Sequence, residues 1–218
     1  MICGVDEAGR GPVMGPMVVA GLAVESDVPL RALNVRDSKK LSPERREALA
    51  PEIRKVGRFE ILVIPAAEID ATRAQMSLND FEARLFATVI ERLRPEIAYV
   101  DSADVNEFDF RRAIASQLSY ELEIVSKHGA DDLFPVVSAA SILAKVVRDA
   151  EMRKIEAELG VKIGSGYSHD QETIDFLVKW LEEKGTLPPY TRASWDTARR
   201  LLSAAATRKL DEFGGGKS

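Results

Sequence analysis

Short apolar runs alternate with amphipathic stretches along much of the chain, and from this alternation we predict an α/β fold with a mixed sheet. Residues 1–5 and 17–24 are rich in Val and other apolar residues, which is typical of buried strands, and the Gly/Pro turn between them indicates a hairpin. Further strands are expected at residues 59–64, 97–101 and 122–125.

Apolar residues at helical spacing predict helices between and after these strands. One helix begins with Ser42 as N-cap and Pro43 in the first helical position, and it runs to about Lys55. A second begins near Asn79 and stops before Pro95. The remaining helices are expected at residues 107–118, 136–159, 171–184 and 194–209. Small residues in the first turns of the 136–159 helix predict that it lies close against the sheet.

The composition suits one globular domain, with or without a helical appendage, because 45% of the 218 residues are hydrophobic and 30% are charged. No apolar stretch reaches the roughly 20 residues that span a bilayer. The N-terminus enters a strand without a leader segment, so we expect a cytoplasmic protein with no membrane contact. The single cysteine, Cys3, is expected to be a buried thiol. Nothing in the sequence demands more than a monomer.

Acidic residues outnumber basic ones, so any nucleic acid must be held by a local patch. The formal net charge is −5, from 30 Lys and Arg against 35 Asp and Glu, and the chain lacks the overall positive charge of many nucleic-acid-binding proteins. Each candidate base, taken singly, is expected to be a solvated surface charge. The candidates are Arg36, Lys39, Lys40, Arg45, Arg46, Lys127, Lys145, Arg148 and Arg192.

Acidic residues stand at the ends of two predicted strands. Asp6 and Glu7 follow the first apolar run, and Asp101 ends the run at 97–101. A buried carboxylate costs roughly several kcal/mol unless a cation or strong donors meet it, so these acids are candidates for a metal site. Because neighbouring strand residues point to opposite faces, the alternative is that Asp6 or Glu7 faces solvent.

A further acid precedes the helix predicted at 136–159. Asp131 and Asp132 stand there side by side, and either could instead cap a helix N-terminus. Carboxylates together with water and phosphate oxygens are the ligands that Mg²⁺ prefers, whereas one Cys and two His hardly assemble a zinc site. Two such ions clamp the attacking water and the leaving oxygen of a phosphoryl displacement, which favours phosphodiester hydrolysis.

Two glycine-rich segments are candidates for close contact with a substrate. Gly9-Arg10-Gly11 has a side chain at only one of its three positions, so its backbone could approach a ligand, although a plain turn is the alternative. Residues 164–168 repeat this feature and add Tyr167. That ring either packs in the loop or stacks on a nucleotide and reads the 2′-hydroxyl that distinguishes RNA from DNA.

A series of motifs stands in a fixed order along nearly the whole chain. They are Asp6-Glu7-Ala8-Gly9-Arg10-Gly11-Pro12, Arg36-Asp37-Ser38-Lys39-Lys40-Leu41, Tyr99-Val100-Asp101, Lys127-His128-Gly129-Ala130-Asp131, residues 137–145 and Gly164-Ser165-Gly166-Tyr167. Together they resemble ribonuclease HII, most closely its archaeal form. The resemblance implies an α/β ribonuclease H-like fold with a mixed five-stranded sheet flanked by helices. It also implies a catalytic domain over residues 1–160, a helical region over 161–209 that lines the substrate groove, and a flexible tail over 210–218.

The resemblance implies a specific activity. Ribonuclease HII hydrolyses the RNA strand of RNA/DNA hybrids and incises 5′ to single ribonucleotides in duplex DNA, leaving 3′-hydroxyl and 5′-phosphate ends, with roles in ribonucleotide excision repair and RNA primer removal. Two Mg²⁺ or Mn²⁺ ions are implied. Their ligands, which are also the implied catalytic residues, map onto Asp6, Glu7, Asp101 and Asp131.

The same resemblance implies which residues contact nucleic acid. The backbone of Gly9-Arg10-Gly11 meets the 2′-hydroxyl, and Tyr167 senses the junction between DNA and RNA. Phosphate contacts are implied for Lys39, Asn79 and Arg148.

Two segments depart from the patterns they resemble. Ser168-His169-Asp170 follows Tyr167 where relatives commonly place Pro or Ser before the Asp, which leaves the loop geometry open. Near the C-terminus, a segment resembles the short motif by which replication proteins dock on the sliding clamp, with Leu210 and Phe213 as its apolar residues. It departs from that motif at Thr207, where glutamine is usual, and at Gly214, where a second aromatic residue is usual. A frayed last helical turn explains the same residues.

Two other functions are consistent with these residues. Another two-metal phosphoryl transferase, such as a DNA nuclease or a strand-transfer enzyme, would cleave an all-DNA duplex. A hybrid-binding or clamp-associated module without activity would bind no Mg²⁺, and its acids would only cap helices.

Overall fold

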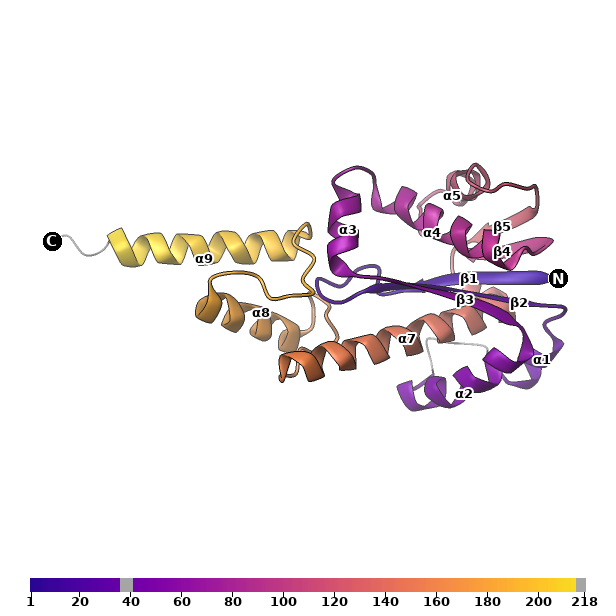
Figure 1. Cartoon of the computed structure of the whole chain (residues 1–218), viewed down its shortest axis with the longest axis horizontal. Coiled ribbons are helices and arrows are strands. Elements are labelled where there is room, and N and C mark those ends of the chain that lie inside the picture. The colour runs from indigo at the N-terminus through magenta and orange to yellow at the C-terminus, as the bar shows by residue number, and fades with distance from the viewer. Residues whose placement is uncertain (36–40, 215–218) are drawn as a thin grey trace. The chain divides into compact units, whose positions relative to one another are not determined.

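Five strands form one mixed sheet in the order β3-β2-β1-β4-β5 (Figure 1). The computed structural model describes residues 1–35 and 41–214, with side chains up to residue 207. The strands are β1 (Ile2–Ala8), β2 (Met17–Val24), β3 (Arg58–Ile64), β4 (Ile97–Asp101) and β5 (Glu123–Lys127). β1 pairs antiparallel with β2 and parallel with β4, and β4 pairs parallel with β5. The predicted hairpin and mixed sheet are confirmed.

Most helices lie where the apolar spacing predicted them. Those in the described part of the chain are α1 (Val28–Ala32), α2 (Pro43–Val56), α3 (Ala66–Arg73), α4 (Leu78–Leu93), α5 (Glu107–Ala115), α6 (Ala130–Leu133), α7 (Pro135–Leu159), α8 (Gln171–Lys184) and α9 (Asp196–Gly214). α1, α3 and α6 were not predicted, because they are too short to show a helical period. α9 passes its predicted end at Lys209, since no Gly or Pro intervenes before Gly214. None of the described helices is both long and apolar enough to cross a membrane.

Side-chain caps fix where two helices begin. The Ser42 hydroxyl accepts a hydrogen bond from the backbone N–H of Arg45 at 3.3 Å, as expected for the N-cap of α2. At α4 the N-cap is Ser77, whose hydroxyl accepts from the backbone N–H of Asp80 at 3.1 Å. Asn79 therefore lies within the first turn of α4, and its side chain can bond elsewhere.

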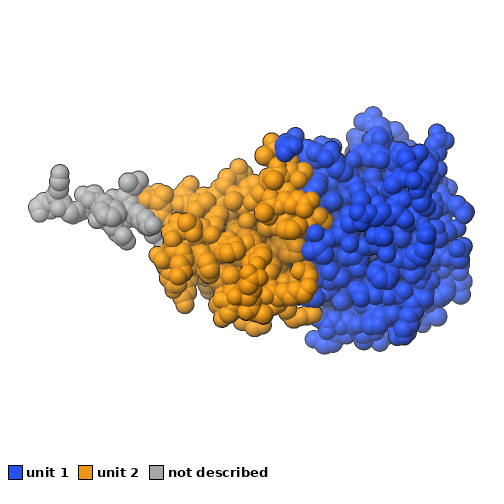
Figure 2. Space-filling view, viewed as in Figure 1, with its two compact units in different colours: residues 1–10, 17–63, 75–150 blue, residues 11–16, 64–74, 151–218 orange. Residues whose placement is uncertain are grey.

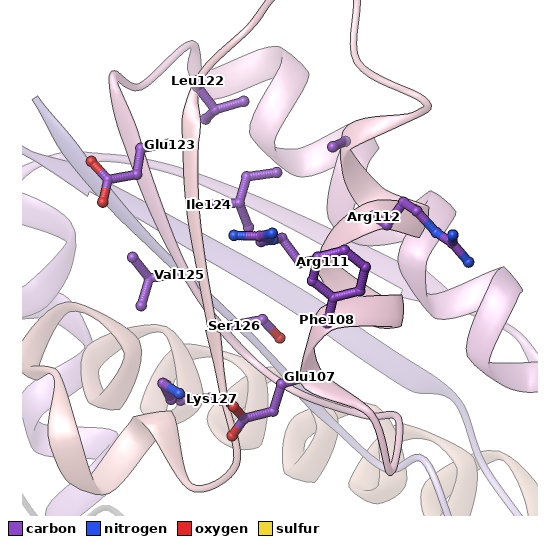
Figure 3. Close-up of a pocket in the computed structure, with 11 residues that line it drawn as sticks. Glu107, Phe108, Arg111, Arg112, Leu122, Glu123, Ile124, Val125, Ser126 and Lys127 are labelled. Atoms are coloured by element: carbon purple, nitrogen blue, oxygen red, sulfur yellow. Dashed lines mark hydrogen bonds and ion pairs between the residues drawn. The ribbon is translucent and has the colours of Figure 1, made fainter.

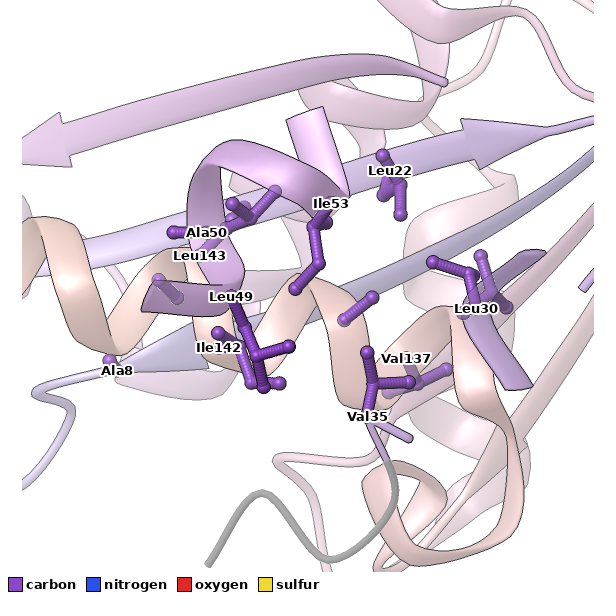
Figure 4. Packing of buried hydrophobic residues seen from close by; sticks show 14 of the residues in the cluster. Ala8, Leu22, Leu30, Val35, Leu49, Ala50, Ile53, Val137, Ile142 and Leu143 are labelled. Carbon is purple, nitrogen blue, oxygen red and sulfur yellow. The ribbon is translucent and has the colours of Figure 1, made fainter. Parts of the chain in front are cut away.

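Helices cover both faces of β2, which explains its unbroken apolar sequence. On one face, alternate residues of β2 pack with α2 and α7 in one hydrophobic cluster, which includes Leu22, Ile53 and Ile142 (Figure 4). On the other face, a Cβ added at Gly21 would overlap Val89 of α4. A strand buried on both sides needs apolar residues at successive positions.

The long helix α7 passes close to β1 at Gly4. A Cβ at Gly4 would overlap the backbone of Val136, so a side chain has no room there. The small residues Ser138-Ala139-Ala140-Ser141 in the first turns of α7 are buried, as their size predicted. Cys3, the neighbour of Gly4, is buried as expected, and burial raises the pKa of its thiol to about 12.

The chain divides into two compact units, each built from several segments (Figure 2). Unit 1 comprises residues 1–10, 17–63 and 75–150 and contains the sheet. Unit 2 comprises residues 11–16, 64–74 and 151–218. Its core joins Val13 and Met14 to side chains of α7, α8 and α9. The division at residue 160 stays a prediction.

Candidate active site

The register between β1 and β4 sets Asp6 beside Asp101. The parallel pairing ends with Val5 opposite Val100, and the two acids are the next residues on their strands. Asp6 is only 4% exposed. Burial, followed by the negative charge of Asp101, raises the pKa of Asp6 to about 7. Two of the predicted acids therefore interact directly at one end of the sheet.

Strand alternation turns Asp6 and Glu7 toward opposite faces of the sheet, and a helix covers each face. On the α7 side, the Ser141 hydroxyl hydrogen-bonds to the Asp6 carboxyl, and the Lys145 charge also lowers the pKa of Asp6. On the α4 side, burial and then the charges of Asp6 and Glu82 raise the pKa of Glu7 well above its usual range. Asp6 is buried and Glu7 is half-buried, so neither acid is fully exposed to solvent.

The environment of one carboxylate oxygen of Glu7 indicates whether the site suits a metal ion. Its Oε2 atom is buried and has no hydrogen-bond partner among the described residues. A buried acceptor without a donor is costly, and carboxylate oxygens are what Mg²⁺ and Mn²⁺ prefer. In the described part of the chain, however, no three His, Cys, Asp or Glu side chains stand ready to hold an ion. The donor chemistry of the Glu7 carboxylate thus fits a divalent cation.

The segment that carries Asp131 is tied to Asp101. The backbone N–H of Ala130 donates to Oδ1 of Asp101 at 2.9 Å. Asp131 follows in the first turn of α6 and is 2% exposed, whereas Asp132 is exposed. The N-cap of α6 is Gly129, and no side chain caps this helix. Of the two adjacent acids, Asp131 is therefore the one buried next to the site.

Arg10 and Asn79, both expected to contact substrate, bind each other. Nη2 of Arg10 donates to Oδ1 of Asn79 at 2.5 Å, and Nε of Arg10 donates to Oε2 of Glu82 at 2.6 Å. Nδ2 of Asn79 donates in turn to Oδ2 of Asp104 at 2.8 Å, in the loop after β4. The side chain of Arg10 is still 35% exposed, so part of it can meet a ligand.

Three residues at the site were missed or misread from the sequence. Glu82 stands on the apolar face of α4, four residues from both Leu78 and Phe86, and an acid in such a place signals a buried partner. Ser141 and Lys145 are one turn apart on α7, so they share a face. Lys145 is partly buried and acts on the active-site acid, although the sequence predicted a solvated charge.

In unit 2, residues 11–16 lie against the loop that carries Tyr167. The backbone N–H groups of Val13 and Met14 both donate to the Gly166 carbonyl, at 2.8 and 3.1 Å. A Cβ added at Gly11 would lie 3.6 Å from Cε1 of Tyr167, which is ordinary contact. The Tyr167 ring is half-buried, and its centroid lies 5.2 Å from that of the exposed His169. The structure thus brings Gly11 and Tyr167 together.

Two bases that the sequence placed at the surface are buried. Arg192 is 0% exposed, and its Nε and Nη2 atoms donate to the Gly15 carbonyl at 3.1 and 3.0 Å. Arg148, on α7, is 6% exposed. The prediction of solvated charges at these positions is wrong, because the surrounding packing encloses both side chains.

Other predicted contacts are only partly described. Lys39 lies outside the described residues, and so do the side chains of Leu210 and Phe213, whose backbone belongs to α9. Thr207 is exposed on α9, and its hydroxyl donates to the Ser203 carbonyl at 3.1 Å.

A cavity of about 650 Å³ lies between α5 and the edge strand β5 (Figure 3). Phe108, Arg111 and Ile124 point into it, and the Arg111 guanidinium lies 5.0 Å from the centroid of the Phe108 ring. None of the four predicted acids lines this cavity. The candidate chemistry therefore belongs to the ends of β1 and β4 and not to this hollow.

Comparison with known proteins places the chain in one family. The family model described as Ribonuclease HII matches residues 3–198. The chain belongs to the ribonuclease HII family. Among curated relatives, the ribonuclease HII of Methanoregula boonei is 50% identical over 213 residues, which are 98% of this chain and 100% of that protein.

Solved structures of ribonuclease HII share the fold. Ribonuclease H2 from Pyrococcus horikoshii OT3 matches with a TM-score of 0.88 and 38% identity, covering 94% of this chain and 98% of that one. Ribonuclease HII from Archaeoglobus fulgidus, solved as a complex with PCNA, matches with a TM-score of 0.86 and 43% identity, covering 92% and 96%. The predicted ribonuclease H-like fold is confirmed. The chain is an endonuclease with ribonuclease H activity on RNA/DNA hybrids.

Proposed function

We propose that this ribonuclease HII also incises 5′ to single ribonucleotides embedded in duplex DNA, leaving 3′-hydroxyl and 5′-phosphate ends. The observation that carries the proposal is the meeting of acids from separate segments at the ends of β1 and β4. Asp6 and Asp101 are set side by side by the register, and the hydrogen bond from Ala130 draws in the segment of Asp131. Ribonucleotide excision repair and RNA primer removal are the processes that such an activity would serve.

The four acids Asp6, Glu7, Asp101 and Asp131 would hold two divalent cations, Mg²⁺ or Mn²⁺. When bound, these ions would activate the attacking water and stabilise the leaving 3′-oxygen of an in-line displacement. The raised pKa values of Asp6 and Glu7 support this role, because clustered negative charge without a cation is unfavourable. Lys145 and Arg10 offset part of that charge.

The backbone of Gly9-Arg10-Gly11 would contact the 2′-hydroxyl. The support comes from Gly11, where the protein itself does not require glycine. Its φ is not positive, and an added Cβ would meet only Tyr167 at 3.6 Å. A methyl group there would instead obstruct a ligand that approaches the backbone closely. Tyr167, next to Gly11, would then stack on the same nucleotide and read its sugar.

Asn79 is the best supported of the proposed phosphate contacts, because it lies in the first turn of α4, where the helix N-terminus favours anions. The family resemblance also implies Lys39 and Arg148, of which Arg148 is only 6% exposed. Asn79 bonds to Arg10, so a phosphate there would be recognised next to the Gly9-Arg10-Gly11 turn.

The C-terminal segment would dock on a sliding clamp. Its support is the motif-like placement of Leu210 and Phe213 and the solved PCNA complex of the Archaeoglobus fulgidus relative. Replacing both residues with Ala should abolish co-elution with PCNA and leave hybrid cleavage unchanged. Retained co-elution would show that another surface binds the clamp.

A duplex with one embedded ribonucleotide tests the proposed activity. We expect a single cut on the 5′ side of that ribonucleotide in the presence of Mg²⁺ or Mn²⁺, with the ends mapped by mass spectrometry, and no product after chelation. Cleavage of an otherwise identical all-DNA duplex would indicate a DNA nuclease. A cut on the 3′ side, or cleavage that survives chelation, would contradict the proposed mechanism.

A further inference from the structure

Backbone hydrogen bonds fix residues 13–15 within unit 2. The Gly15 N–H donates to the Tyr190 carbonyl at 2.9 Å, and the Arg192 N–H donates to the Val13 carbonyl at 2.8 Å. Met14 forms an antiparallel bridge with Thr191. The Gly166 carbonyl accepts from the other side, as described above. These residues therefore have little freedom to move.

Gly11 is held differently, by a side chain. The indole N–H of Trp195 donates to the Gly11 carbonyl at 3.0 Å. Gly11 is exposed, and its carbonyl belongs to the peptide bond with Pro12, which has no N–H, so that carbonyl is the only group through which a hydrogen bond can hold this peptide. The orientation of the Gly11 carbonyl thus depends on Trp195.

Trp195 is itself firmly oriented. The guanidinium carbons of Arg73 and Arg192 lie 4.7 and 4.9 Å from its ring centroid, which is cation–π distance. The carboxylate of Asp70 accepts the backbone N–H groups of Ala193 and Ser194, at 2.7 and 3.1 Å, just before Trp195. Ring stacking and the turn before it together pre-organise the indole N–H toward Gly11.

We propose that Trp195 is a positioning residue for ribose selectivity. Its N–H sets the orientation of the peptide between Gly11 and Pro12, at the end of the Gly9-Arg10-Gly11 segment, and thereby the backbone offered to a 2′-hydroxyl. This inference rests on the proposed contact between Gly9-Arg10-Gly11 and the ribose. A single embedded ribonucleotide presents one 2′-hydroxyl, so its incision depends on that one contact. A continuous RNA strand offers a 2′-hydroxyl at every position, so hybrid cleavage depends on it less.

The Trp195→Phe variant isolates the hydrogen bond, because Phe keeps an aromatic ring for Arg73 and Arg192 but has no N–H. We expect kcat/KM for single-ribonucleotide incision to fall about tenfold, as one lost orienting hydrogen bond would cause. Hybrid cleavage should fall by less than about threefold. Trp180→Phe is the matched control, since Trp180 packs on Phe176 in the unit 2 core with ring centroids 5.7 Å apart. It should leave the ratio of the two activities unchanged.

Equal losses on both substrates, or no loss on either, would overturn the role of Trp195. If the unchanged protein cuts hybrids but not at single ribonucleotides, the proposed function is wrong and this inference falls with it. Hydrogen exchange of the Trp195 indole N–H examines the hydrogen bond directly, and it does not require a Trp195 variant that folds. In Trp180→Phe protein the single indole N–H signal belongs to Trp195, and we expect it to exchange slowly with solvent. Exchange as fast as that of a solvent-exposed indole N–H without a hydrogen bond would overturn the proposal.

Discussion

Arg10 donates a hydrogen bond from Nε to the Glu82 carboxylate at 2.6 Å, and the Glu82 side chain is fully buried. Glu82 raises the pKa of Glu7 and Arg10 lowers it. A buried acid on α4 thus holds the arginine of the Gly9-Arg10-Gly11 turn, and that arginine balances part of the charge around Glu7. Both roles depend on the same ion pair.

The Glu82→Gln variant keeps the side-chain size and removes the charge that holds Arg10. We expect the free energy of unfolding in urea to fall by about 1–2 kcal/mol, because a charged hydrogen bond is lost while repulsion toward Glu7 is relieved. Single-ribonucleotide incision should also weaken. Glu60→Gln is the control, since it removes only an exposed pair with Arg92 at 3.5 Å. If the free energy of unfolding falls by the same small amount in both variants, the buried ion pair contributes no more to stability than a surface pair.

Metal-free protein should become less stable as pH rises toward neutrality. The pKa of Asp6 is about 7 in the folded protein against an ordinary 3.8, chiefly because of burial. The folded state therefore keeps a proton that the unfolded chain has already released. This contribution to stability is fully present below the ordinary value and is lost as pH rises through about 7.

Melting curves in chelator at several pH values between about 5 and 8 measure this effect. Asp6→Asn should flatten the pH dependence and raise the metal-free Tm at the upper end by about 5 °C. In the unchanged protein, Mg²⁺ should restore the Tm that is lost as pH rises, whereas in Asp6→Asn it should not. An unaltered pH slope in Asp6→Asn would assign the effect to another group.

The adjacent acids Asp131 and Asp132 provide a matched pair of variants. Asp131→Asn should reduce hybrid cleavage by about a hundredfold or more, as expected for loss of a group that holds a catalytic ion. Asp132→Asn, exposed on the same short helix, should stay within about threefold of the unchanged protein. Steady-state rates at saturating Mg²⁺ compare the two. A larger loss of hybrid cleavage in Asp132→Asn than in Asp131→Asn would indicate that Asp132, and not Asp131, holds the ion.

Gly4 and Gly11 need to be glycine for different reasons: Gly4 for packing inside the protein and Gly11, as proposed, for binding a ligand. Gly4→Ala would push a methyl group into the backbone of Val136, so we expect a loss of stability of about 2 kcal/mol or more. Gly11→Ala meets only Tyr167 at 3.6 Å and should leave Tm within about 2 °C. Incision at a single ribonucleotide should nevertheless fall at least about tenfold. Full incision by Gly11→Ala would show that no ligand approaches that backbone.

Tyr167→Phe and Tyr167→Ala distinguish stacking from hydroxyl recognition. If the ring stacks and the hydroxyl reads the sugar, Phe should weaken single-ribonucleotide incision more than cleavage of a continuous hybrid, and Ala should weaken it further. Stacking is worth about 1–3 kcal/mol per base, so the Ala variant should lose at least about fivefold. Equal losses on both substrates would indicate that Tyr167 only packs in its loop.

Sequence reasoning located the elements well wherever nearby residues decide them. The strand at 97–101 and the helix at 171–184 coincide with β4 and α8, because their apolar periods and flanking residues are local signals. The Ser42 cap and the small residues of α7 were also readable from neighbours in the chain. The short helix α6 gave no such signal, so local patterns left its acids undecided between capping and chemistry, and only the family resemblance assigned Asp131 to the site.

The partners of the site residues were beyond reach of local patterns. Arg10 and Glu82 stand 72 positions apart, and only the packing of α4 against the sheet brings them together. Arg192 was predicted to be a solvated base, because its hydrogen-bond acceptor, the Gly15 carbonyl, lies 177 positions away in the sequence. Nothing near Arg192 in the chain indicates that partner.

The sequence by itself determined most of the strands and helices, the acids at strand ends and the family of the chain, because these signals come from residues that are neighbours along the chain. Tertiary structure decided what those acids meet. Asp6 and Glu7 point to opposite faces of one strand, and a sequence cannot say whether a face is open. Because α7 covers one face and α4 the other, Asp6 is buried and Glu7 is half-buried, and both acids gain charged neighbours and raised pKa values. Burial is a property of the packed fold, and it is burial that makes this pair of carboxylates chemically useful.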